Sequence, residues 1–497
     1  MAYTSSPQFD TYKTTQIAFD GEDLFRSGDL TINRDLQIVN MYYDKISMTN
    51  KETEQFLVKR PGINETGFTL NKLDPIAPIR GWFYDVDQNA MYWVVGFKVF
   101  VTKPDVSLLP REVCTLASET GNVGFTTFLK TDNTRYVVFS DGLNLWIDDY
   151  VALTCTAVTS PDIPTPHQPS PIYIDGYILL AKTGTGDMYN SNLDDPFAWT
   201  AGDFITAEMS SDFAIKLIKA KNYVVVMGYS SLEYFYNAGV EAGSPFARND
   251  SPYRSVGYVT GCCTIGDATY FVGRDGGMNL QVFQLNNFKV EPISTSVVER
   301  TLQTFSSTPN TPPPINFDKD GFCISIDGHT FYCLRTPQTT WAYDVEAKNW
   351  YEWRNPANLP LALEATWTLP SGMFLAITGQ TSFSYMSPKL YMDYGNTFTA
   401  KYVTEEFSSE TYNWKTLHRM FVVGDRHLNT GTSNIMISWS DDNGSSYSTP
   451  RPLNLFSASP FITRCGRFRK RMFKLEYTDN FPLRLRALEL ELNIGTS

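Results

Sequence analysis

Pairs of adjacent carboxylates are the residues of this chain best suited to acid–base chemistry. They occur at Asp148-Asp149, Asp194-Asp195, Glu405-Glu406 and Asp441-Asp442. Glycoside hydrolysis needs two carboxylates that converge on one bond from about 5–9.5 Å apart. Neighbouring residues of a strand point to opposite faces of the sheet, so an adjacent pair does not converge in this way. These acids are expected in turns and on the surface, and no catalytic residue is predicted.

The segment SWSDDNGSSYS at 438–448 matches the Asp-box turn of sialidases, through Ser440, Asp442, Gly444, Ser446 and Tyr447. This motif is a hairpin turn that bonds to itself and has no catalytic role. A propeller sialidase usually carries several copies, one per blade, whereas this chain carries one outside its repeats. We therefore expect a structural turn. A sialidase-like glycosidase or a carbohydrate-binding propeller remains the alternative function, because a fold does not fix a function.

Residues that could bind metal lack the required spacing. Asp85, Asp87 and Asn89 imitate the start of an EF-hand loop, but Ala90 replaces its glycine and Gly96 replaces its final glutamate. The four His are scattered, and none is recognisably placed to activate a Ser or Cys nucleophile. No metal, cofactor or enzymatic activity is predicted.

The seven Cys show no regular spacing and are expected to be buried, reduced thiols. Cys323 and Cys333 flank a hairpin at Asp327-Gly328. A two-residue turn would put the two thiols on opposite faces of the hairpin, whereas a three-residue loop would align them.

One basic cluster contrasts with a formal net charge of −12, and it comprises Arg464, Arg467, Arg469, Lys470 and Arg471. If the segment is a strand, Arg467, Arg469 and Arg471 share one face. The cluster could be a solvated edge that prevents aggregation. It could also contact an acidic partner protein or DNA phosphate electrostatically. Between the two contacts, we favour a patch that binds a partner protein.

Composition excludes several classes of protein. Charged residues make up 19% and aromatic residues 14% of the 497 residues, which argues against disorder and coiled coils. The acidic balance argues against a dedicated nucleic-acid binder. No apolar run reaches the roughly 18 residues of a membrane helix. The start, MAYTSSPQFD, does not resemble a signal peptide. Synthesis in a reducing cytoplasm without membrane insertion is expected.

A repeat of strand, polar turn and strand runs from about residue 80 to 390. Successive turns lie 43–46 residues apart, with one step of 61, at Gln88, Asp132, Asp175, Lys221, Gly266, Asp327 and Ser371. The strand after each turn is almost continuously apolar, as in MYWVVGF (91–97) and YVVVMGY (223–229), which suits strands covered on both faces. Such repeats without helical periodicity predict an all-β fold with a β-propeller of six or seven blades.

The segments on either side of the repeat differ from it. Residues 1–65 are predicted to form N-terminal extended strands, and 66–396 the propeller with a Pro-rich insertion near 304–320. Residues 397–497 are predicted to form a C-terminal β-sandwich-like domain. In its last segment the apolar positions change from odd to even numbers, so a bulge is expected near Ala487.

Two segments resemble tail hub, or nozzle, proteins of short-tailed bacteriophages, which are also called packaged-DNA stabilisation proteins. Residues 34–63 pair Asn40-Met41-Tyr42 with an Arg60-Pro61-Gly62 turn, as the openings of that family do. Residues 251–300 resemble one of its blades, with a Gly-rich turn and an Ile-Ser-Thr close. The long TPPP loop departs from the family pattern.

The resemblance implies a structural virion protein of the phage tail, assembled in the host cytoplasm. Such proteins form a homohexamer below the portal and its adaptor (the head-to-tail connector), extend the DNA channel and retain packaged DNA. The implied partners are the adaptor and a tail fibre, tailspike or needle protein. Double-stranded DNA would pass during ejection without specific recognition. The C-terminal domain and the N-terminal strands would contact the adaptor, and the faces of the propeller would contact neighbouring subunits.

Overall fold

The computed structural model describes residues 13–19, 37–47, 53–69, 79–104, 110–240, 242–277, 279–306, 320–363, 365–369, 374–378, 382–425 and 431–495. The chain divides into two compact units. Unit 1 comprises residues 1–63, 351–359 and 387–497, and unit 2 comprises residues 64–350 and 360–386. The division by sequence into three consecutive segments, with limits at 65 and 396, stays a prediction.

Unit 2 is built from antiparallel four-stranded sheets. The first four blades are β6 (Ile79–Asp85), β7 (Ala90–Val95), β8 (Lys98–Thr102) and β9 (Arg111–Thr115); β10 (Gly124–Leu129), β11 (Arg135–Ser140), β12 (Leu145–Asp149) and β13 (Thr154–Ala157); β14 (Ile172–Ile174), β15 (Tyr177–Ala181), β16 (Asp187–Asn192) and β17 (Asp195–Thr206); and β18 (Ala214–Ala220), β19 (Tyr223–Gly228), β20 (Leu232–Asn237) and β21 (Phe246–Arg254).

Three further blades complete the set. They are β22 (Gly257–Ile265), β23 (Ala268–Arg274), β24 (Leu280–Asn286) and β25 (Lys289–Pro292); β26 (Gly321–Ile326), β27 (His329–Arg335), β28 (Thr340–Asp344) and β29 (Asn349–Trp353); and β30 (Ala365–Thr368), β31 (Phe374–Thr378), β32 (Ser382–Ser387) and β5 (Gly62–Thr69). Six of these sheets are separate, whereas β26–β29 belong to a larger sheet. The chain passes from unit 2 to unit 1 within β29, after Trp350.

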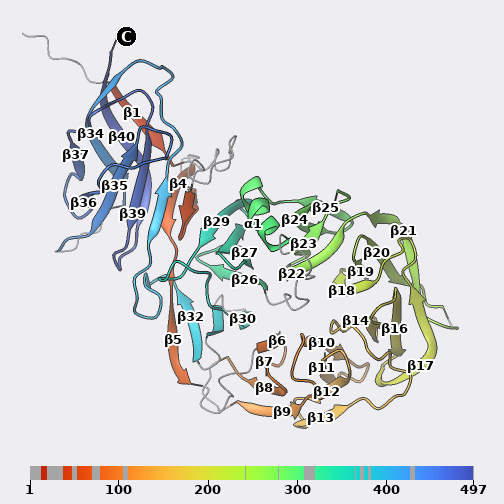
Figure 1. Ribbon diagram of the computed structural model, residues 1–497. Coiled ribbons are helices and arrows are strands. Elements are labelled where there is room, and N and C mark those ends of the chain that lie inside the picture. Colours follow the sequence, from red (N-terminus) through yellow and green to blue (C-terminus); the bar gives the residue numbers. More distant parts are fainter. Residues whose placement is uncertain are drawn as a thin grey trace, which may run out of the picture. The chain divides into compact units, whose positions relative to one another are not determined.

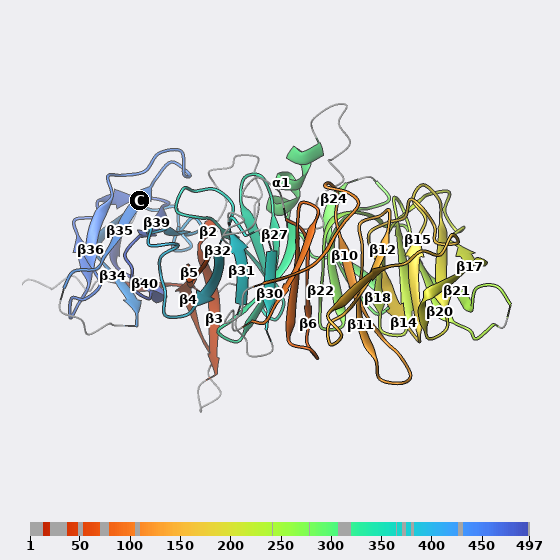
Figure 2. The same ribbon diagram turned by 90° about the horizontal axis from the view of Figure 1, so that it is seen from below.

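The blades form a closed ring. The first strands of neighbouring blades contact one another from β6 through β10 and β14 to β18, and from β22 through β26 to β30. Strand β22 contacts β19 of the fourth blade, and β30 contacts β6. Figure 1 shows these strands on the inside of the ring, with β9, β13, β17 and β21 outside, and Figure 2 shows the ring from its edge. The prediction of a propeller with six or seven blades is confirmed, since the described residues close a ring with six separate sheets and the β26–β29 blade.

The last blade takes its outer strand from the start of the chain. β5 pairs with β32, and Thr66 Oγ1 donates to the Phe383 carbonyl at 3.1 Å. Trp93 of the first blade packs edge-on against Phe383 and Trp367 of the last, with ring centroids 5.4 and 6.2 Å apart. Backbone pairing and aromatic packing therefore both close the ring.

The predicted hairpin turns occur where residues tolerate left-handed backbone. Asn89, Asn133, Asp175 and Asp327 all have positive φ, between 49° and 66°. Short hairpins require this conformation, because it matches the twist of the flanking strands. The strands that follow are also as predicted, since β7 is buried at every position and β19 at all but its first. The 45-residue repeat therefore corresponds to the blades.

The first strands of neighbouring blades approach each other closely, and glycine permits this approach. A Cβ added at Gly124 of β10 would lie 2.0 Å from the carbonyl oxygen of Pro169. No side chain fits that distance, so glycine is required where the backbone of one blade meets the segment entering the next.

Unit 1 contains two groups of paired strands. One has the order β3 (Met41–Ser47), β4 (Thr53–Lys59), β40 (Arg484–Ile494), β34 (Lys415–Gly424) and β37 (Phe461–Thr463), with β1 (Lys13–Ala18) on β40 and β38 (Arg467–Phe468) on β34. The other has the order β2 (Gln37–Val39), β33 (Ala400–Val403), β39 (Met472–Tyr477), β35 (Asn434–Ser440) and β36 (Arg451–Asn454). These strands fit the predicted sandwich-like domain, which the N-terminal strands join.

The predicted bulge in the final strand is confirmed. Pairing between β34 and β40 shifts register between Val423–Ala487 and Gly424–Leu485. The buried leucines change from odd positions before the shift, Leu483 and Leu485, to even positions after it, Leu488 and Leu490. A bulge explains this, because one extra residue moves the following side chains to the other face.

Helix α1 (Ser296–Ser306) follows β25 and was not expected from the sequence. It buries Val298 and Leu302, which are four residues apart and so share one helical face. Most of the predicted Pro-rich insertion lies outside the described residues. Within the described ranges, no helix has the length and apolarity needed to cross a membrane.

Candidate interaction surfaces

The adjacent acids have separate local roles. Asp148 is fully buried and accepts hydrogen bonds from Tyr92 Oη at 2.8 Å and from Arg111 at 3.1 Å. Burial raises the pKa of Asp148, and its tyrosine and arginine partners oppose that shift. Asp149 instead accepts the N–H of Val151 within its own turn, at 3.0 Å. Side chains with such different surroundings do not form a catalytic pair.

The other acidic pairs follow the same rule. Asp194 accepts the N–H of Thr131 at 2.8 Å, while Asp195 accepts the N–H of Phe197 at 3.0 Å. Glu406 pairs with Lys470 at 2.5 Å. Among the residues that the structure describes, no group of three or more His, Cys, Asp or Glu is arranged to hold a metal ion.

A buried Ser–His contact was missed in the sequence because its members are 27 positions apart. Ser140 Oγ lies 2.5 Å from His167 Nε2, and His167 Nδ1 lies 2.7 Å from the Pro164 carbonyl. The carbonyl can only accept, so Nδ1 carries the proton and Nε2 accepts from the serine. Burial lowers the pKa of His167. Ser140 is 0% and His167 2% exposed, so substrate cannot reach the serine and the pair is structural.

The Asp-box turn has the self-bonded geometry expected of it. Asp442 accepts hydrogen bonds from Ser440 Oγ at 2.7 Å and from the N–H of Ser446 at 2.9 Å. Its bond with the Ser446 hydroxyl is the largest cause that lowers the pKa of Asp442 to about 2. The carboxylate is therefore committed to its own turn, as the structural interpretation requires.

The structure does not bring all five predicted basic residues together. Arg464, Arg467 and Lys470 are exposed, and Arg469 is half-buried. Arg471 is only 2% exposed. β38 ends at Phe468 and the chain bends before β39, so the alternation that would align Arg467 with Arg471 is broken. Arg471 is therefore not part of a common surface with the other four.

Arg471 instead makes internal contacts. Its Nε and Nη2 donate to both carboxylate oxygens of Asp441 at 2.7 and 2.8 Å, and its Nη1 donates to the Cys465 carbonyl at 2.6 Å. Its guanidinium also lies 4.3 Å from the centre of the Phe468 ring. This residue fixes the loop that carries the exposed arginines.

Two of the remaining arginines flank exposed aromatic rings. The Arg467 guanidinium lies 5.4 Å from the Trp414 ring, and that of Arg469 lies 5.1 Å from Trp414 and 4.8 Å from Tyr412. Tyr412 is 62% and Trp414 38% exposed. Trp, Tyr and Arg are enriched at the energetically dominant positions of protein interfaces. We call these four residues the Trp414 surface.

A second exposed cluster lies on the β12–β13 turn in unit 2. Val151 is 83% exposed and Leu153 62%. Leu153 also has a φ of +57°, a left-handed conformation that is uncommon for a leucine. Two apolar side chains thus face solvent on a turn whose backbone does not favour them.

The same turn recurs in the β26–β29 blade with charged side chains. Asp149 accepts the N–H groups of Val151 and Ala152, and Asp344 accepts those of Glu346 and Ala347 in the same way, at 2.8–3.0 Å. Lys348 has the same φ of +57° as Leu153. One turn geometry therefore carries exposed Glu346 and Lys348 in one blade, and Val151 and Leu153 in another.

Exposed apolar side chains also occur at the corresponding end of the neighbouring blade. Leu193 is 62% and Phe197 39% exposed. Phe197 contacts Tyr136 of β11 with ring centroids 6.1 Å apart, which joins the two blades. We call Val151, Leu153, Leu193 and Phe197 the apolar rim. Clusters of exposed apolar residues on soluble proteins commonly mark interaction sites.

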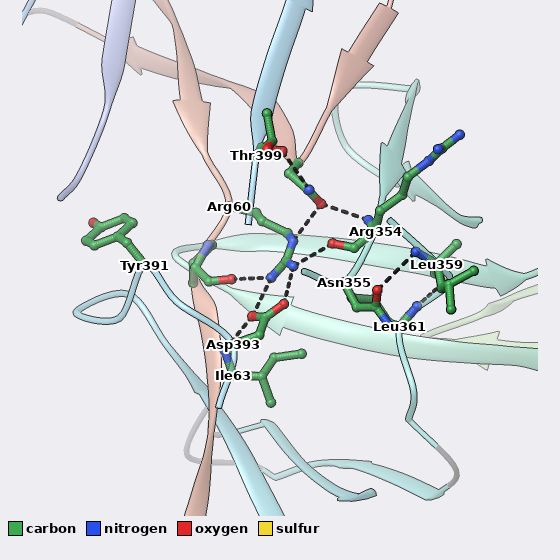
Figure 3. Close-up of polar contacts among 12 residues, drawn as sticks. Arg60, Ile63, Arg354, Asn355, Leu359, Leu361, Tyr391, Asp393 and Thr399 are labelled. Atoms are coloured by element: carbon green, nitrogen blue, oxygen red, sulfur yellow. Dashed lines mark hydrogen bonds and ion pairs between the residues drawn. The ribbon is translucent and has the colours of Figure 1, made fainter. Parts of the chain in front are cut away.

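The two motifs of residues 34–63 meet in unit 1 at a fully buried arginine. Arg60 Nε donates to Asn40 Oδ1 at 2.9 Å, and its two terminal nitrogens bind both oxygens of Asp393 at 3.0 and 2.5 Å. The carbonyls of Pro61 and Arg354 accept the two remaining N–H groups, both at 2.9 Å. All five guanidinium donors are thus satisfied (Figure 3).

The partners of Arg60 are themselves held in place. Asn40 Oδ1 also accepts the backbone N–H of Arg354, and Asn40 Nδ2 donates to the Thr399 carbonyl. Asp393 also accepts the N–H of Ile63 at 3.0 Å. This Arg60 network joins all three stretches of chain that make up unit 1.

Gly62 completes the motif for a steric reason. A Cβ at this position would lie 2.1 Å from the Met392 carbonyl oxygen. Arg60-Pro61-Gly62 therefore combines a buried cation with a backbone contact that only glycine allows.

Lys59, next to Arg60, predicts a pH dependence for unit 1. Burial, followed by the charge of Arg60, lowers the pKa of Lys59 to about 7. Above that pH the folded state loses a proton that the unfolded chain, with a pKa of 10.5, still holds. The unfolded state then binds more protons, so stability rises with pH between these values, by at most about 1.4 kcal/mol per pH unit.

We expect denaturant unfolding of unit 1 to require more denaturant at pH 9 than at pH 7. The Lys59→Met variant should lose most of this difference. Burial also lowers the pKa of Lys401, which remains in both proteins, so the comparison isolates Lys59. Equal pH dependence in both proteins would contradict the prediction.

Comparison with known proteins identifies a family for more than half of the chain. A family model described as "Bacteriophage P22 Gp10, beta-propeller" matches residues 30–355, which is more than half of the sequence. The matched region includes Asn40, Arg60, Arg354 and most of the blades. No curated protein matches the sequence.

Several solved structures are similar to this chain at low sequence identity. The N-terminal domain of Nup159 is 10% identical with a TM-score of 0.38, and covers 70% of this chain and 99% of its own. The RRP9 WD40 repeats are 8% identical with a TM-score of 0.38, and cover 66% and 99%. The extracellular domain of the putative one component system BT4673 from B. thetaiotaomicron is 9% identical with a TM-score of 0.40, and covers 78% and 47%. These likenesses carry no argument about function.

Proposed function

The chain belongs to the family described as Bacteriophage P22 Gp10, beta-propeller, and on that premise we propose that it is the tail hub or nozzle of a short-tailed phage. Membership makes it a phage structural propeller protein and a component of the virion. The proposal adds a position below the portal and its adaptor, where the protein extends the DNA channel and helps to retain packaged DNA.

The family match over residues 30–355 is the observation that carries this proposal. The Arg60 network supports it, because residues of both N-terminal motifs meet in one buried cluster. The adjacent carboxylates considered for acid–base catalysis have local structural roles, and the Ser–His pair is buried away from solvent. These features favour a building unit over an enzyme.

We further propose that six copies form a ring and that exposed surfaces bind neighbouring virion proteins. The Trp414 surface, through its arginines, suits an acidic partner such as a segment of the adaptor, a fibre or a needle. The apolar rim suits a contact between copies, since interface centres are depleted of charge. An overall charge of −12 also disfavours tight binding to DNA passing through the channel.

The proposal is tested by mass and by position. Light scattering of the purified protein should give about six times the 56.2 kDa chain mass, alone or after addition of the adaptor. Electron microscopy of particles carrying a tagged copy should place the tag at the tail vertex. A protein that stays monomeric with the adaptor and is absent from the tail vertex would refute the proposal.

A further inference from the structure

Two cysteines face each other across the seam between the first two blades. Cys114 lies on β9 and Cys155 on β13, the outer strands of adjacent blades, and these strands contact each other. Both cysteines pack against one apolar cluster that includes Val101 and Val137. Neither is fully buried.

A bulge explains why Cys114 points into this seam. In the β8–β9 pairing, Val99 is opposite Cys114 and Phe100 is opposite Glu112, so the register shifts at Val113. Val113 and Cys114 consequently both pack against the cluster, although adjacent strand residues normally face opposite ways. The bulge directs the Cys114 thiol toward the neighbouring blade.

The Cys114 thiol lies near enough to the Cys155 thiol to raise its pKa. The same seam is held by Arg111, three residues before Cys114, which pairs with Asp148 at 3.1 Å. Asp148 lies opposite Cys155 in the β12–β13 ladder. Strand pairing and an ion pair therefore fix the backbone on both sides of the thiol pair.

We propose that Cys114 and Cys155 form a disulfide that links the two blades once the protein leaves a reducing environment. The oxidant is a small-molecule disulfide of the glutathione class. The Cys114 thiolate attacks one of its sulfurs, which breaks the S–S bond and releases one small thiolate. The Cys155 sulfur then attacks the mixed disulfide, forms the protein S–S bond and releases the second small thiolate. The two protons lost by the cysteines pass to the released thiolates or to solvent.

The order of attack follows from the surroundings of Cys155. The neighbouring Cys114 thiol, followed by burial, raises the pKa of Cys155. The thiolate is the reactive species, so Cys155 reacts poorly with reagents in solution. It reacts second, as an intramolecular nucleophile held beside its target.

The other cysteines provide controls. Cys333 and Cys465 are buried. Phe322 pairs with Cys333 while Cys323 pairs with Tyr332, so Cys323 and Cys333 lie on opposite faces of their two-residue hairpin. This confirms one of the two arrangements considered from the sequence, and it leaves these two thiols without a disulfide geometry.

The test oxidises the full-length native protein with excess oxidised glutathione, then unfolds it in N-ethylmaleimide for peptide mass spectrometry. The wild type should yield one cross-linked peptide pair containing Cys114 and Cys155, two hydrogens lighter than the separate peptides. The disulfide would close a loop that contains β10, β11 and β12. The midpoint of thermal unfolding of the oxidised protein should therefore rise by roughly 5 °C. Cys114→Ser and Cys155→Ser should show neither change, whereas Cys323→Ser should behave as wild type.

Complete alkylation of both cysteines after oxidation, or separate glutathione adducts on each, would overturn the proposal. Its timing rests on the proposed virion function, whereas the reaction itself does not. If the purified protein forms the link but particles isolated in N-ethylmaleimide lack it, then the assumed exposure of the virion protein to oxidant is wrong. Ring formation by the Cys114→Ser variant would be unaffected in either case.

Discussion

Replacing Arg60 with methionine is expected to destabilise unit 1 by about 3–5 kcal/mol, because it leaves a buried carboxylate without its cation. Asp393 is 1% exposed, and its Oδ1 would keep the N–H of Ile63 as a donor after losing that of Arg60. Asn40 Oδ1 would also lose a donor. Lysine at position 60 keeps the charge but offers three donors in place of five, so Arg60→Lys should cost less than Arg60→Met and still be measurable.

Hydrogen exchange measured across a denaturant series can assign this loss to the correct unit. Peptides from β3, β4 and β40 should exchange at lower denaturant in the Arg60→Met variant. Peptides from β15 and β19 of unit 2 serve as an internal reference. The apolar double variant Arg60→Met with Asp393→Leu should lose much less stability than the sum of the losses in the two single variants, since neither member of the ion pair is left without the other. Additive losses would argue against a coupled pair.

The Arg60 network also shows where prediction from sequence ends. The motifs containing Asn40 and Arg60 were recognised, and they lie 20 residues apart. Asp393 lies 333 residues from Arg60, and no local pattern marks it as the partner. A buried arginine and an exposed one look alike in a sequence, because burial depends on which distant segments pack around the residue.

The propeller was predictable for the opposite reason. Its signals are local: a residue that tolerates positive φ, such as Asn133 or Asp327, followed by an apolar run. Repetition makes such weak signals strong. The basic cluster was harder, because the expected alternation assumed one continuous strand, whereas a bend before β39 turns Arg471 inward. Trp414 and Tyr412 approach these arginines from a segment about 55 residues earlier and carry no motif of their own.

Giving the β12–β13 turn the charged side chains of the equivalent turn in the β26–β29 blade should abolish assembly of the ring without affecting the fold. The double variant Val151→Glu with Leu153→Lys gives the β12–β13 turn the side chains that Glu346 and Lys348 supply in the β26–β29 blade. Both turns have the same hydrogen bonds and the same positive φ, so stability should change by less than about 0.5 kcal/mol.

The expected effect on assembly is large because the apolar rim would contact another copy. Burying a new charge at an interface centre without a partner typically costs 2 kcal/mol or more, which weakens each contact by about 30-fold. In a ring every contact carries this loss, so light scattering at micromolar concentration should report the single chain in place of the ring. Incorporation of the variant into particles should fall in parallel.

The reciprocal exchange tests whether impaired assembly comes from the loss of a specific contact or from a general change in surface polarity. Glu346→Val with Lys348→Leu adds the same apolar side chains to the other turn, and the ring should form as in the wild type. If both exchanges impair assembly equally, the effect comes from altered solubility, since the two turns share one backbone geometry and lie in different blades. If neither exchange impairs assembly, the apolar rim is not the surface through which copies contact each other. The left-handed leucine at position 153 would then need another explanation, because an exposed apolar residue in that backbone conformation gains nothing within the monomer.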